Sequence, residues 1–440
     1  MSRSTIAAIS TPPAAGGVAI IRISGGDSLK IAGKVFCPSG KTGVENFVPN
    51  HMYPGRILLE GFADFGLCVY FKAPRSFTGE DVVELHCHGG VQISRAVLRA
   101  VLDNGASMAQ NGEFTKRAFL NGKLSLASAE GMIDMINASS MAEVRAGAML
   151  YAEKLTGEVR AMQEELKDVL AGIAADIDYP EEDIEATSLG NVGSRLSAVL
   201  CNIRKLIEGY SAGKKIKSGV TCALCGAPNA GKSSLLNALL GYDKAIVSPR
   251  AGTTRDAVEG TIEIDGVAYN LTDTAGLRED VDEIEAMGIS MAKRIVRSAD
   301  MILYVCEGEY TPLEGVDEDD PRLIKIYNKC DISPAVPQNF DIFISAKTGE
   351  NIDKLKDIMA SKAVGEGGLQ GAYIIERRHY LALCRAGESL SGAIAAIGSY
   401  PLDVISLDIT EAWSALGEIT GETANEEIIS QVFAKFCVGK

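Results

Sequence analysis

Between residues 215 and about 360, short apolar runs alternate with longer segments whose apolar residues recur at helical spacing. This alternation is typical of a doubly wound α/β domain, in which helices cover both faces of a mostly parallel sheet. Asp265 and Gly266 separate two of the runs and form a strong signal for a tight hairpin turn. The apolar runs predict strands over Val220–Cys225, Ala257–Ile264, Val267–Thr272, Met301–Val305, Leu323–Tyr327 and Ile342–Ile344.

The pattern is helical from about Leu124 to Tyr210, with an interruption at Pro180. Residues 364–371 read as a flexible glycine-rich linker, and helical sequence then continues through Trp413 to the end. Some seventy residues are few for an independent core, roughly the lower limit for one. We therefore expect them to complete a bundle with residues 124–210, so that the α/β segment is an insertion. One apolar stripe recurs at steps of three and four residues, at Leu155, Val159, Met162, Leu166, Val169 and Ile173.

Residues 1 to about 120 differ from both patterns. Strand-like runs at Val18–Ile23, Cys68–Phe71 and Val82–Leu85 predict a sheet, with a loop over Ser76–Asp81 before the last of them. We therefore expect a multidomain protein of α/β and all-α parts. The expected domains are an α+β domain at 1–120, a discontinuous helical domain at 121–212 and 372–440, and an inserted α/β domain at 213–362.

Composition adds constraints rather than a function. Hydrophobic residues make up 46% of the 440 residues and charged residues 23%, as in ordinary globular proteins. The net charge of −15 argues against a generic nucleic-acid binder, although a local basic patch or a basic partner remains compatible with it. The apolar run Ile6–Ile9 is too short for a signal-peptide core, and scattered cysteines suggest a reducing cytoplasm.

Two short motifs resemble metal sites. Cys222 and Cys225 form a CxxC, but both fall on a predicted strand, so buried core cysteines are the better interpretation. His86-Cys87-His88 has no matching pair elsewhere in a chain with 4 histidines, which disfavours a metal cluster there.

The strongest chemical signal is the glycine-rich segment from Gly226 to Ser233. It follows a predicted strand and precedes an apolar helical pattern, the context that a phosphate-binding loop requires. Gly226 and Gly231 let the backbone curl around phosphate oxygens, and Lys232 supplies a positive charge to them. The hydroxyl of Ser233 can ligate Mg²⁺. The helix that follows adds the positive end of its dipole.

Further loops at predicted strand ends identify the nucleotide as GTP. Gly252 to Asp256 offers a hydroxyl for Mg²⁺, and Asp273 to Gly276 offers a carboxylate to the metal shell and a backbone N–H to the γ-phosphate. Asn328 to Asp331 can read guanine, because the Asp331 carboxylate accepts from the N1–H and the exocyclic amine together. Ser345, Ala346 and Lys347 would brace the base. The order of these loops predicts a Ras-like P-loop GTPase domain.

The hydrolytic group is not the usual one. Many small GTPases place Gln directly after the Asp-x-x-Gly loop to orient water, but this chain has Leu277. A carboxylate from the acidic run Glu279–Glu285 could replace it, although most of that run is expected to be a solvated loop. Asn229 offers a neutral oxygen that could hold a monovalent cation at the phosphates. Arg255 could instead serve as an arginine finger, with a salt bridge as the equal alternative.

Motifs outside the α/β segment resemble those of a single family, the tRNA modification GTPases MnmE, also called TrmE. The resemblance runs through the whole chain in order. It rests on Thr11-Pro12-Pro13, Gly17–Gly25, Ser76–Asp81, Gly112–Leu124 and the terminal Phe436-Cys437-Val438-Gly439-Lys440. The departures are Ala14-Ala15, where many relatives have Gly-Arg, and Val438, where Ile is common.

The resemblance implies a function. Members of the family are GTPases that work with the FAD protein MnmG (GidA), as a heterotetramer or larger complex. Together they add a carboxymethylaminomethyl or aminomethyl group to C5 of the wobble uridine at position 34 of certain tRNAs. The resemblance also implies a homodimer that dimerises through a folate-binding N-terminal domain and takes a one-carbon unit from 5-formyl- or 5,10-methylene-tetrahydrofolate. Dimerisation of the G domains would be coupled to hydrolysis. The alternative is a regulatory or ribosome-assembly GTPase switch without chemistry of its own.

The family motifs also imply site residues. The K⁺ ligands would be Asn229, Ser248, Thr253 and, through its backbone, Arg250. The Mg²⁺ ligands would be Ser233 and Thr254, and the general base Glu285. Folate contacts would be Arg22, Glu80, Lys123 and Lys440. Cys437 has two interpretations, a catalytic thiol and a cysteine packed near the folate. The expected GTP site comprises Asn229, Ala230, Gly231, Lys232, Ser233, Ser234, Ser248, Pro249, Arg250, Ala251, Gly252, Thr253, Thr254, Asp273, Thr274, Ala275, Gly276, Asn328, Lys329, Asp331, Ser345, Ala346 and Lys347.

Overall fold

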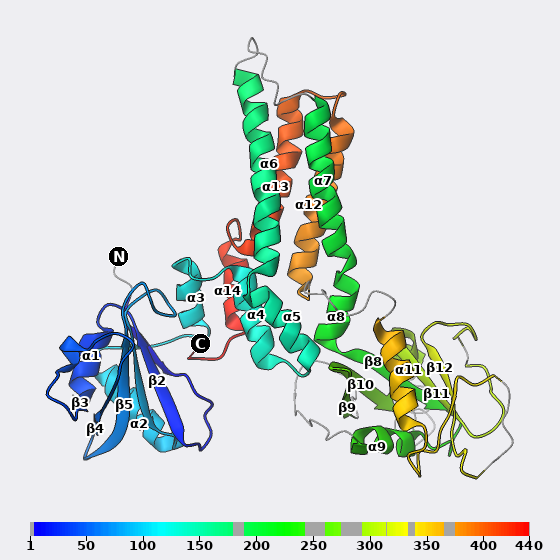
Figure 1. The fold of residues 1–440 in the computed structure, drawn as a ribbon, viewed down its shortest axis with the longest axis horizontal. Helices are drawn as coiled ribbons and strands as arrows, with labels where there is room; N and C mark the ends of the chain where they lie inside the picture. The colour runs from blue at the N-terminus through cyan, green and yellow to red at the C-terminus, as the bar shows by residue number, and fades with distance from the viewer. Residues whose placement is uncertain are drawn as a thin grey trace, which may run out of the picture. The chain divides into compact units, whose positions relative to one another are not determined.

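The computed structural model describes residues 4–178, 189–242, 260–273, 293–313, 315–332, 339–364 and 375–439. The chain divides into two compact units. Figure 1 shows the helices and strands that belong to them, coloured by residue number. One unit comprises Met1–Ile133, Met149–Leu200 and Ala382–Lys440, and the other comprises Asp134–Ala148 and Cys201–Leu381. Among the described helices, none is long and apolar enough to cross a membrane.

The first unit begins with a seven-stranded sheet in the order β3-β4-β5-β6-β2-β1-β7. Helices α1 (Ser28–Val35) and α2 (Val91–Asp103) pack on it and bury a core of aliphatic side chains that includes Ile21, Ile23 and Leu85. The strand runs expected here are confirmed within longer strands. The strands are β1 (Ile6–Ile9), β2 (Val18–Ser24), β3 (Phe36–Pro38), β4 (Met52–Leu59), β5 (Phe62–Phe71), β6 (Val82–His88) and β7 (Ser107–Met108), with a short 3-10 helix at Val44–Asn46.

The remainder of this unit is helical and begins with α3 (Glu113–Leu120). The predicted apolar stripe lies on α6 (Lys154–Asp178), and all its members are buried, as amphipathic packing requires. Helix α6 packs against α13 (Leu402–Thr420), where Gln163 Nε2 donates to the carbonyl of Trp413 over 3.4 Å. The other helices are α4 (Leu126–Asn137), α5 (Met141–Tyr151), α7 (Leu189–Glu208), α12 (Arg377–Ala396) and α14 (Glu426–Ala434), of which α4, α5, α7 and α12 continue into the second unit.

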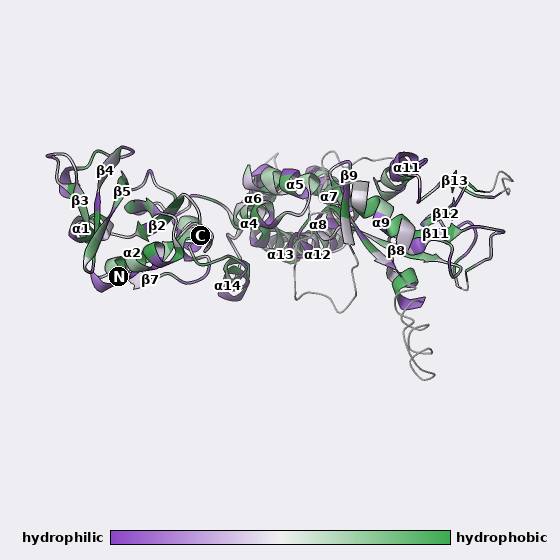
Figure 2. Cartoon of the chain, turned by 90° about the horizontal axis from the view of Figure 1, so that it is seen from below, coloured by the Kyte–Doolittle hydropathy of each residue, from purple (hydrophilic) through white to green (hydrophobic). Residues whose placement is uncertain are grey.

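These helices carry both hydrophobic and hydrophilic residues along their length (Figure 2). Local signals set their ends: Asn425 caps α14 by accepting from the N–H of Ile428 over 2.9 Å, and Gly421 ends α13 at a φ of 96°. Beyond α14, Val438 forms an isolated bridge with Asn111. The Ser10 hydroxyl donates to the carbonyl of Gly439 over 3.0 Å, which fixes the chain's last described residue beside β1.

The second unit contains a six-stranded sheet in the order β13-β12-β11-β8-β10-β9. Only β9 is antiparallel to its neighbour, so the predicted doubly wound α/β class is confirmed. The predicted hairpin is also confirmed: Asp265 and Gly266 have φ of 50° and 83°, as a two-residue type I′ turn demands. The strands are β8 (Val220–Gly226), β9 (Gly260–Ile264), β10 (Val267–Asp273), β11 (Met301–Cys306), β12 (Leu323–Tyr327) and β13 (Ile342–Phe343).

In the described part of this unit, helices α8 (Tyr210–Ser218), α9 (Lys232–Tyr242) and α11 (Ile352–Val364) accompany the sheet, and residues 293–298 are also helical. Lys217 on α8 forms ion pairs with Asp134 and Glu376, whose side chains are nearly buried. Burial opposes the charge of Lys217, but the two carboxylates outweigh it and raise the pKa of its ammonium group. The residues just before and just after the α/β segment are thereby joined through one partly buried cation.

Candidate functional site

The glycine-rich loop follows β8 and curls as a phosphate-binding loop must. Gly226 has a φ of 137°, and a Cβ there would lie 1.9 Å from the carbonyl oxygen of Val305 on β11. Gly231 has a φ of 90°, and its Cβ would lie 2.3 Å from Asn328 Nδ2. Asn229, between them, also has a positive φ of 62°. The close approach of Val305 and Asn328, together with the positive φ angles, explains why glycine occupies both positions.

The charged and hydroxyl groups of this loop lie together at the start of α9. The buried Lys232 donates from Nζ to the carbonyls of Gly226 and Ala227, over 3.0 and 2.8 Å, so its ammonium lies across the loop. Ser233 Oγ donates to Asp273 Oδ2 over 3.2 Å. A hydroxyl beside a carboxylate supplies the hard oxygen atoms that Mg²⁺ prefers. The N-terminus of α9 adds the positive end of its helix dipole, which favours an anion.

The loop after β12 binds directly to the phosphate loop. Asn328 is buried; its Nδ2 donates to the carbonyl of Ala230 over 2.8 Å, and its Oδ1 accepts from the N–H of Ala346 over 3.0 Å. Lys329 Nζ donates to the carbonyl of Asn229 over 3.1 Å. Three loops at the carboxyl ends of parallel strands thus form one structure, which is where ligands bind in such sheets.

The remaining described members of the expected base site lie close by. Ser345 is buried and its hydroxyl accepts from the N–H of Thr348 over 3.2 Å, whereas Asp331 and Lys347 are exposed at the surface. Sequence reasoning missed Glu307, which forms an ion pair with Lys329. Its position after β11, at the same edge of the sheet, could have suggested it.

The two CxxC thiols are buried strand residues, as expected. Burial raises the pKa of the Cys225 thiol to about 12 and that of Cys222 further. The His86 ring contacts the carboxylate of Glu84, and the His88 ring contacts the carboxylate of Asp64. Within the described ranges, no group of three or more His, Cys, Asp or Glu side chains could hold a metal ion.

The N-terminal sheet carries a second polar cluster around Arg22. Arg22 Nε donates to Glu84 Oε1 over 2.9 Å, and its guanidinium lies over the rings of Phe77 and Phe114. Burial opposes the charge of Glu84, but hydrogen bonds from His86 and Arg22 outweigh it and lower the pKa of Glu84. Sequence reasoning missed Glu84, which no motif marks.

Glu80 and Lys123 belong to the same domain. Glu80 Oε2 accepts from Ser24 Oγ over 2.8 Å and from Arg117 over 3.0 Å, while Lys123 donates to the carbonyl of Pro74 over 3.1 Å. The structure therefore already holds Glu80 in place. At the C-terminus, the backbone carbonyl of Cys437 accepts from the N–H of Gly112 over 3.4 Å, and Cys437 is exposed.

Several expected site residues lie outside the described residues, and their predicted roles stay predictions. They are Ser248, Pro249, Arg250, Ala251, Gly252, Thr253, Thr254, Arg255, Thr274, Ala275, Gly276, Leu277, Glu285 and Lys440.

Comparisons with known proteins agree with these features. The family model of the MnmE helical domain matches residues 126–437, and that of the GTP-binding protein TrmE N-terminus matches residues 5–123. Two similar curated proteins are both called tRNA modification GTPase MnmE. The one from Carboxydothermus hydrogenoformans is 35% identical over 100% of both chains, and the one from Natranaerobius thermophilus is 36% identical over 100% of both chains.

Among solved structures, the G domain of the T. maritima FeoB iron transporter is 27% identical and covers 33% of this chain and 98% of its own, with a TM-score of 0.25. That score adds nothing to the strand order already described.

Proposed function

The chain belongs to the family of tRNA modification GTPases MnmE and is a GTP hydrolase acting in tRNA modification. We propose that K⁺ activates its hydrolysis of GTP. The observation that supports GTP as the ligand is the junction of three loops at Asn328, beside Lys232 and the Ser233–Asp273 pair. The proposed division of the chain is 1–120, 121–212 with 372–440, and 213–362.

The proposed hydrolytic step uses cations in place of an arginine finger. Ser233 and Thr254 would hold Mg²⁺, which supplies charge to the β- and γ-phosphates, and the contact between Ser233 and Asp273 supports an oxygen-rich metal shell there. Asn229, Ser248, Thr253 and the backbone of Arg250 would hold K⁺ at the same phosphates. Asn229 is exposed at the turn of the phosphate loop, a suitable position for this. Glu285 would orient the attacking water, because Leu277 cannot.

Two measurements test this step. GTP turnover of the full chain should be much faster in KCl than in NaCl, because an arginine finger contributes ~10³–10⁵ in rate and K⁺ takes its place. Equal rates in the two salts would remove K⁺ from the account. Glu285→Ala should abolish turnover while GTP binding survives, and unchanged turnover would exclude Glu285 as the base.

We further propose that the N-terminal domain binds a one-carbon tetrahydrofolate and dimerises, and that the homodimer works with MnmG on tRNA. The group added to C5 of uridine 34 would contain the carbon from 5-formyl- or 5,10-methylene-tetrahydrofolate. Cations suit the glutamyl tail and a carboxylate suits the N–H donors of the pterin ring, which supports Arg22, Lys123, Lys440 and Glu80 as the contacts. Titrating the chain with 5-formyl-tetrahydrofolate tests the assignment, since a failure to bind would overturn it.

A further inference from the structure

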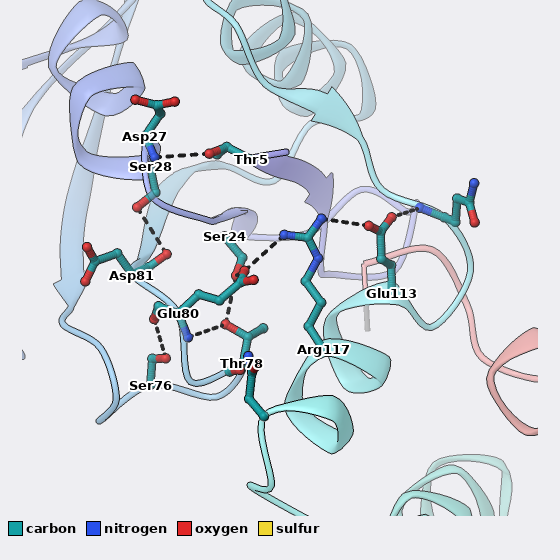
Figure 3. Close-up of polar contacts among 12 residues, drawn as sticks. Thr5, Ser24, Asp27, Ser28, Ser76, Thr78, Glu80, Asp81, Glu113 and Arg117 are labelled. Atoms are coloured by element: carbon teal, nitrogen blue, oxygen red, sulfur yellow. Dashed lines mark hydrogen bonds and ion pairs between the residues drawn. The ribbon is translucent and has the colours of Figure 1, made fainter. Parts of the chain in front are cut away.

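Arg117 is a buried cation between two carboxylates in the N-terminal domain (Figure 3). Its side chain on α3 is 5% exposed. One guanidinium nitrogen donates to Glu113 Oε1 over 2.8 Å and another to Glu80 Oε2 over 3.0 Å. Arginine suits this place because its planar guanidinium presents several donors in fixed directions, so a single side chain can bind two carboxylates at once. The arrangement joins α3 to the loop that carries Glu80.

The Glu113 end of this bridge is itself anchored. Glu113 Oε2 accepts from the N–H of Gln110 over 2.9 Å, and the N–H of Glu113 donates to the carbonyl of Gln110 over 3.2 Å. Gly112, with a φ of 64°, lies directly before α3 as its N-cap residue. Glu113 and Arg117 also lie one helical turn apart, so they face each other on α3. Arg117 therefore approaches Glu80 from a fixed direction.

The Glu80 end is fixed through only one of its oxygens. Oε2 accepts from Arg117 and also from Ser24 Oγ, over 2.8 Å, and the fully buried Ser24 is held by the Thr78 hydroxyl over 2.8 Å. The N–H of Glu80 donates to Thr78 Oγ1 over 3.2 Å. Across the part of the chain that the structure describes, Oε1 of Glu80 has no hydrogen-bond partner. Two donors converge on one oxygen and leave the other available to a ligand.

The charge of the cluster points to the same use. Two carboxylates share one guanidinium, so the group carries one unit of excess negative charge in a mostly buried place, and the Glu80 side chain is 16% exposed. Such a group favours a partner that donates hydrogen bonds, and hydrogen bonds to an ionised carboxylate are stronger than neutral ones. The N–H and amino donors of a pterin ring have this chemistry.

We propose that Arg117 is a positioning residue for the folate site, which holds Glu80 so that Oε1 accepts from the ring donors of the folate. This inference rests on the folate binding proposed above. Arg117 acts through Glu80 and does not itself touch the ligand. Without Arg117, the Glu80 carboxylate loses its charged partner and its fixed orientation. The ligand must then order the carboxylate when it binds.

A double-mutant cycle separates this role from a purely structural one. The full chain is titrated with 5-formyl-tetrahydrofolate as wild type, Glu80→Gln, Arg117→Lys and the double variant. Lysine keeps the charge but cannot span both carboxylates as the guanidinium fork does. We expect Arg117→Lys to weaken binding by about tenfold, the loss of one charge-assisted contact. In the Glu80→Gln background the same change should weaken binding by less than about twofold, because coupled residues are not additive.

Two further variants keep the test decisive. Ser24→Ala removes the other donor to Oε2 without changing any charge, and we expect it to weaken binding severalfold only when Glu80 is present. Ser24→Ala replaces Arg117→Lys in the test if Arg117→Lys does not fold, and thermal unfolding shows whether it does. Arg195→Lys is the matched control: Arg195 pairs with Glu165 on α6, away from the sheet, so the affinity for folate should be unchanged.

The outcomes distinguish this inference from the proposed function. If the unaltered chain does not bind the folate, the folate assignment fails and the role of Arg117 fails with it. If the chain binds but Arg117→Lys weakens binding equally with and without Glu80, folate binding stands and the positioning role is wrong. Full affinity in folded Arg117→Lys would also overturn the positioning role alone.

Discussion

Substituting Asn328 with alanine should weaken nucleotide binding strongly, although Asn328 is buried beneath the site. Its side chain holds the carbonyl of Ala230 in the phosphate loop and the N–H of Ala346 in the base loop. Alanine removes both contacts and leaves both backbone groups without their partner. The phosphate loop and the base loop would then lose the side chain that joins them, and the contact of Lys329 with Asn229 would remain.

The magnitude follows from the two groups that lose their partner. A buried polar group without a hydrogen bond costs about 1–3 kcal/mol, so the two together cost about 2–6 kcal/mol. The Ala230 contact is fully buried and the Ala346 contact only partly, which places the second nearer the lower limit. Because about 1.4 kcal/mol corresponds to tenfold in affinity, the dissociation constant for GDP should rise at least tenfold.

Titration with a fluorescent GDP analogue measures this effect, and Asn270→Ala is its matched control. Asn270 on β10 also makes two hydrogen bonds, donating to the carbonyl of Ser218 over 2.9 Å and accepting from Thr261 over 3.0 Å. It contacts no residue of the phosphate loop. The control variant should lose stability in thermal unfolding, because the lost bonds resemble those of Asn328 in kind. Its affinity for GDP should stay within about twofold, because these bonds join Asn270 to Thr261 and Ser218. Equal affinities for Asn328→Ala and wild type would refute the reasoning.

Further predictions concern the charge bridge, the buried thiols and the C-terminus. Lys217→Met removes the cation that two nearly buried carboxylates share and should lower the free energy of unfolding by about 3–5 kcal/mol in urea, whereas Lys215→Met, which loses a contact with one carbonyl, should cost about 1 kcal/mol. Because the folded-state pKa of Lys217 is raised, its contribution is complete below the unfolded pKa of about 10.4 and is lost as the pH rises through the folded value, so a constant difference up to pH ~12 would contradict it. Cys225, whose pKa burial raises to about 12, should resist iodoacetamide at pH ~8 while exposed thiols react, as mass spectrometry of peptides would report. Gly439→Ala places a Cβ 2.1 Å from a β1 carbonyl oxygen at a φ of 101°, so it should displace the C-terminal segment and weaken folate binding; unchanged affinity in the titration would count against this.

Local patterns predicted the parts of the fold that local physics determines. The hairpin at Asp265-Gly266 follows from backbone conformations that few residues adopt, and the stripe on α6 follows from helical spacing. The loops around the nucleotide site could be placed because parallel strands end at one edge of a sheet. Element ends were less certain: the strand expected to reach Ile344 ends as β13 at Phe343.

Contacts between distant residues could not be predicted in this way. Glu80 and Arg117 are separated by 37 residues, and Lys217 and Glu376 by 159. No periodicity or motif links such pairs, because the tertiary fold alone brings them together. Arg117 does fall within a segment that resembles the family, but nothing in the sequence identifies the carboxylate it binds.

The central claim is that this GTP hydrolase serves the modification of wobble uridine in tRNA. Nucleoside analysis of tRNA from a strain that lacks the gene tests it most directly, with complementation by the wild-type chain and by Glu285→Ala. The account predicts that uridine 34 loses its C5 group in the deletion strain, regains it with the wild-type chain and does not regain it with Glu285→Ala. Fully modified wobble uridines in the deletion strain would contradict the account and favour a GTPase switch that regulates another process.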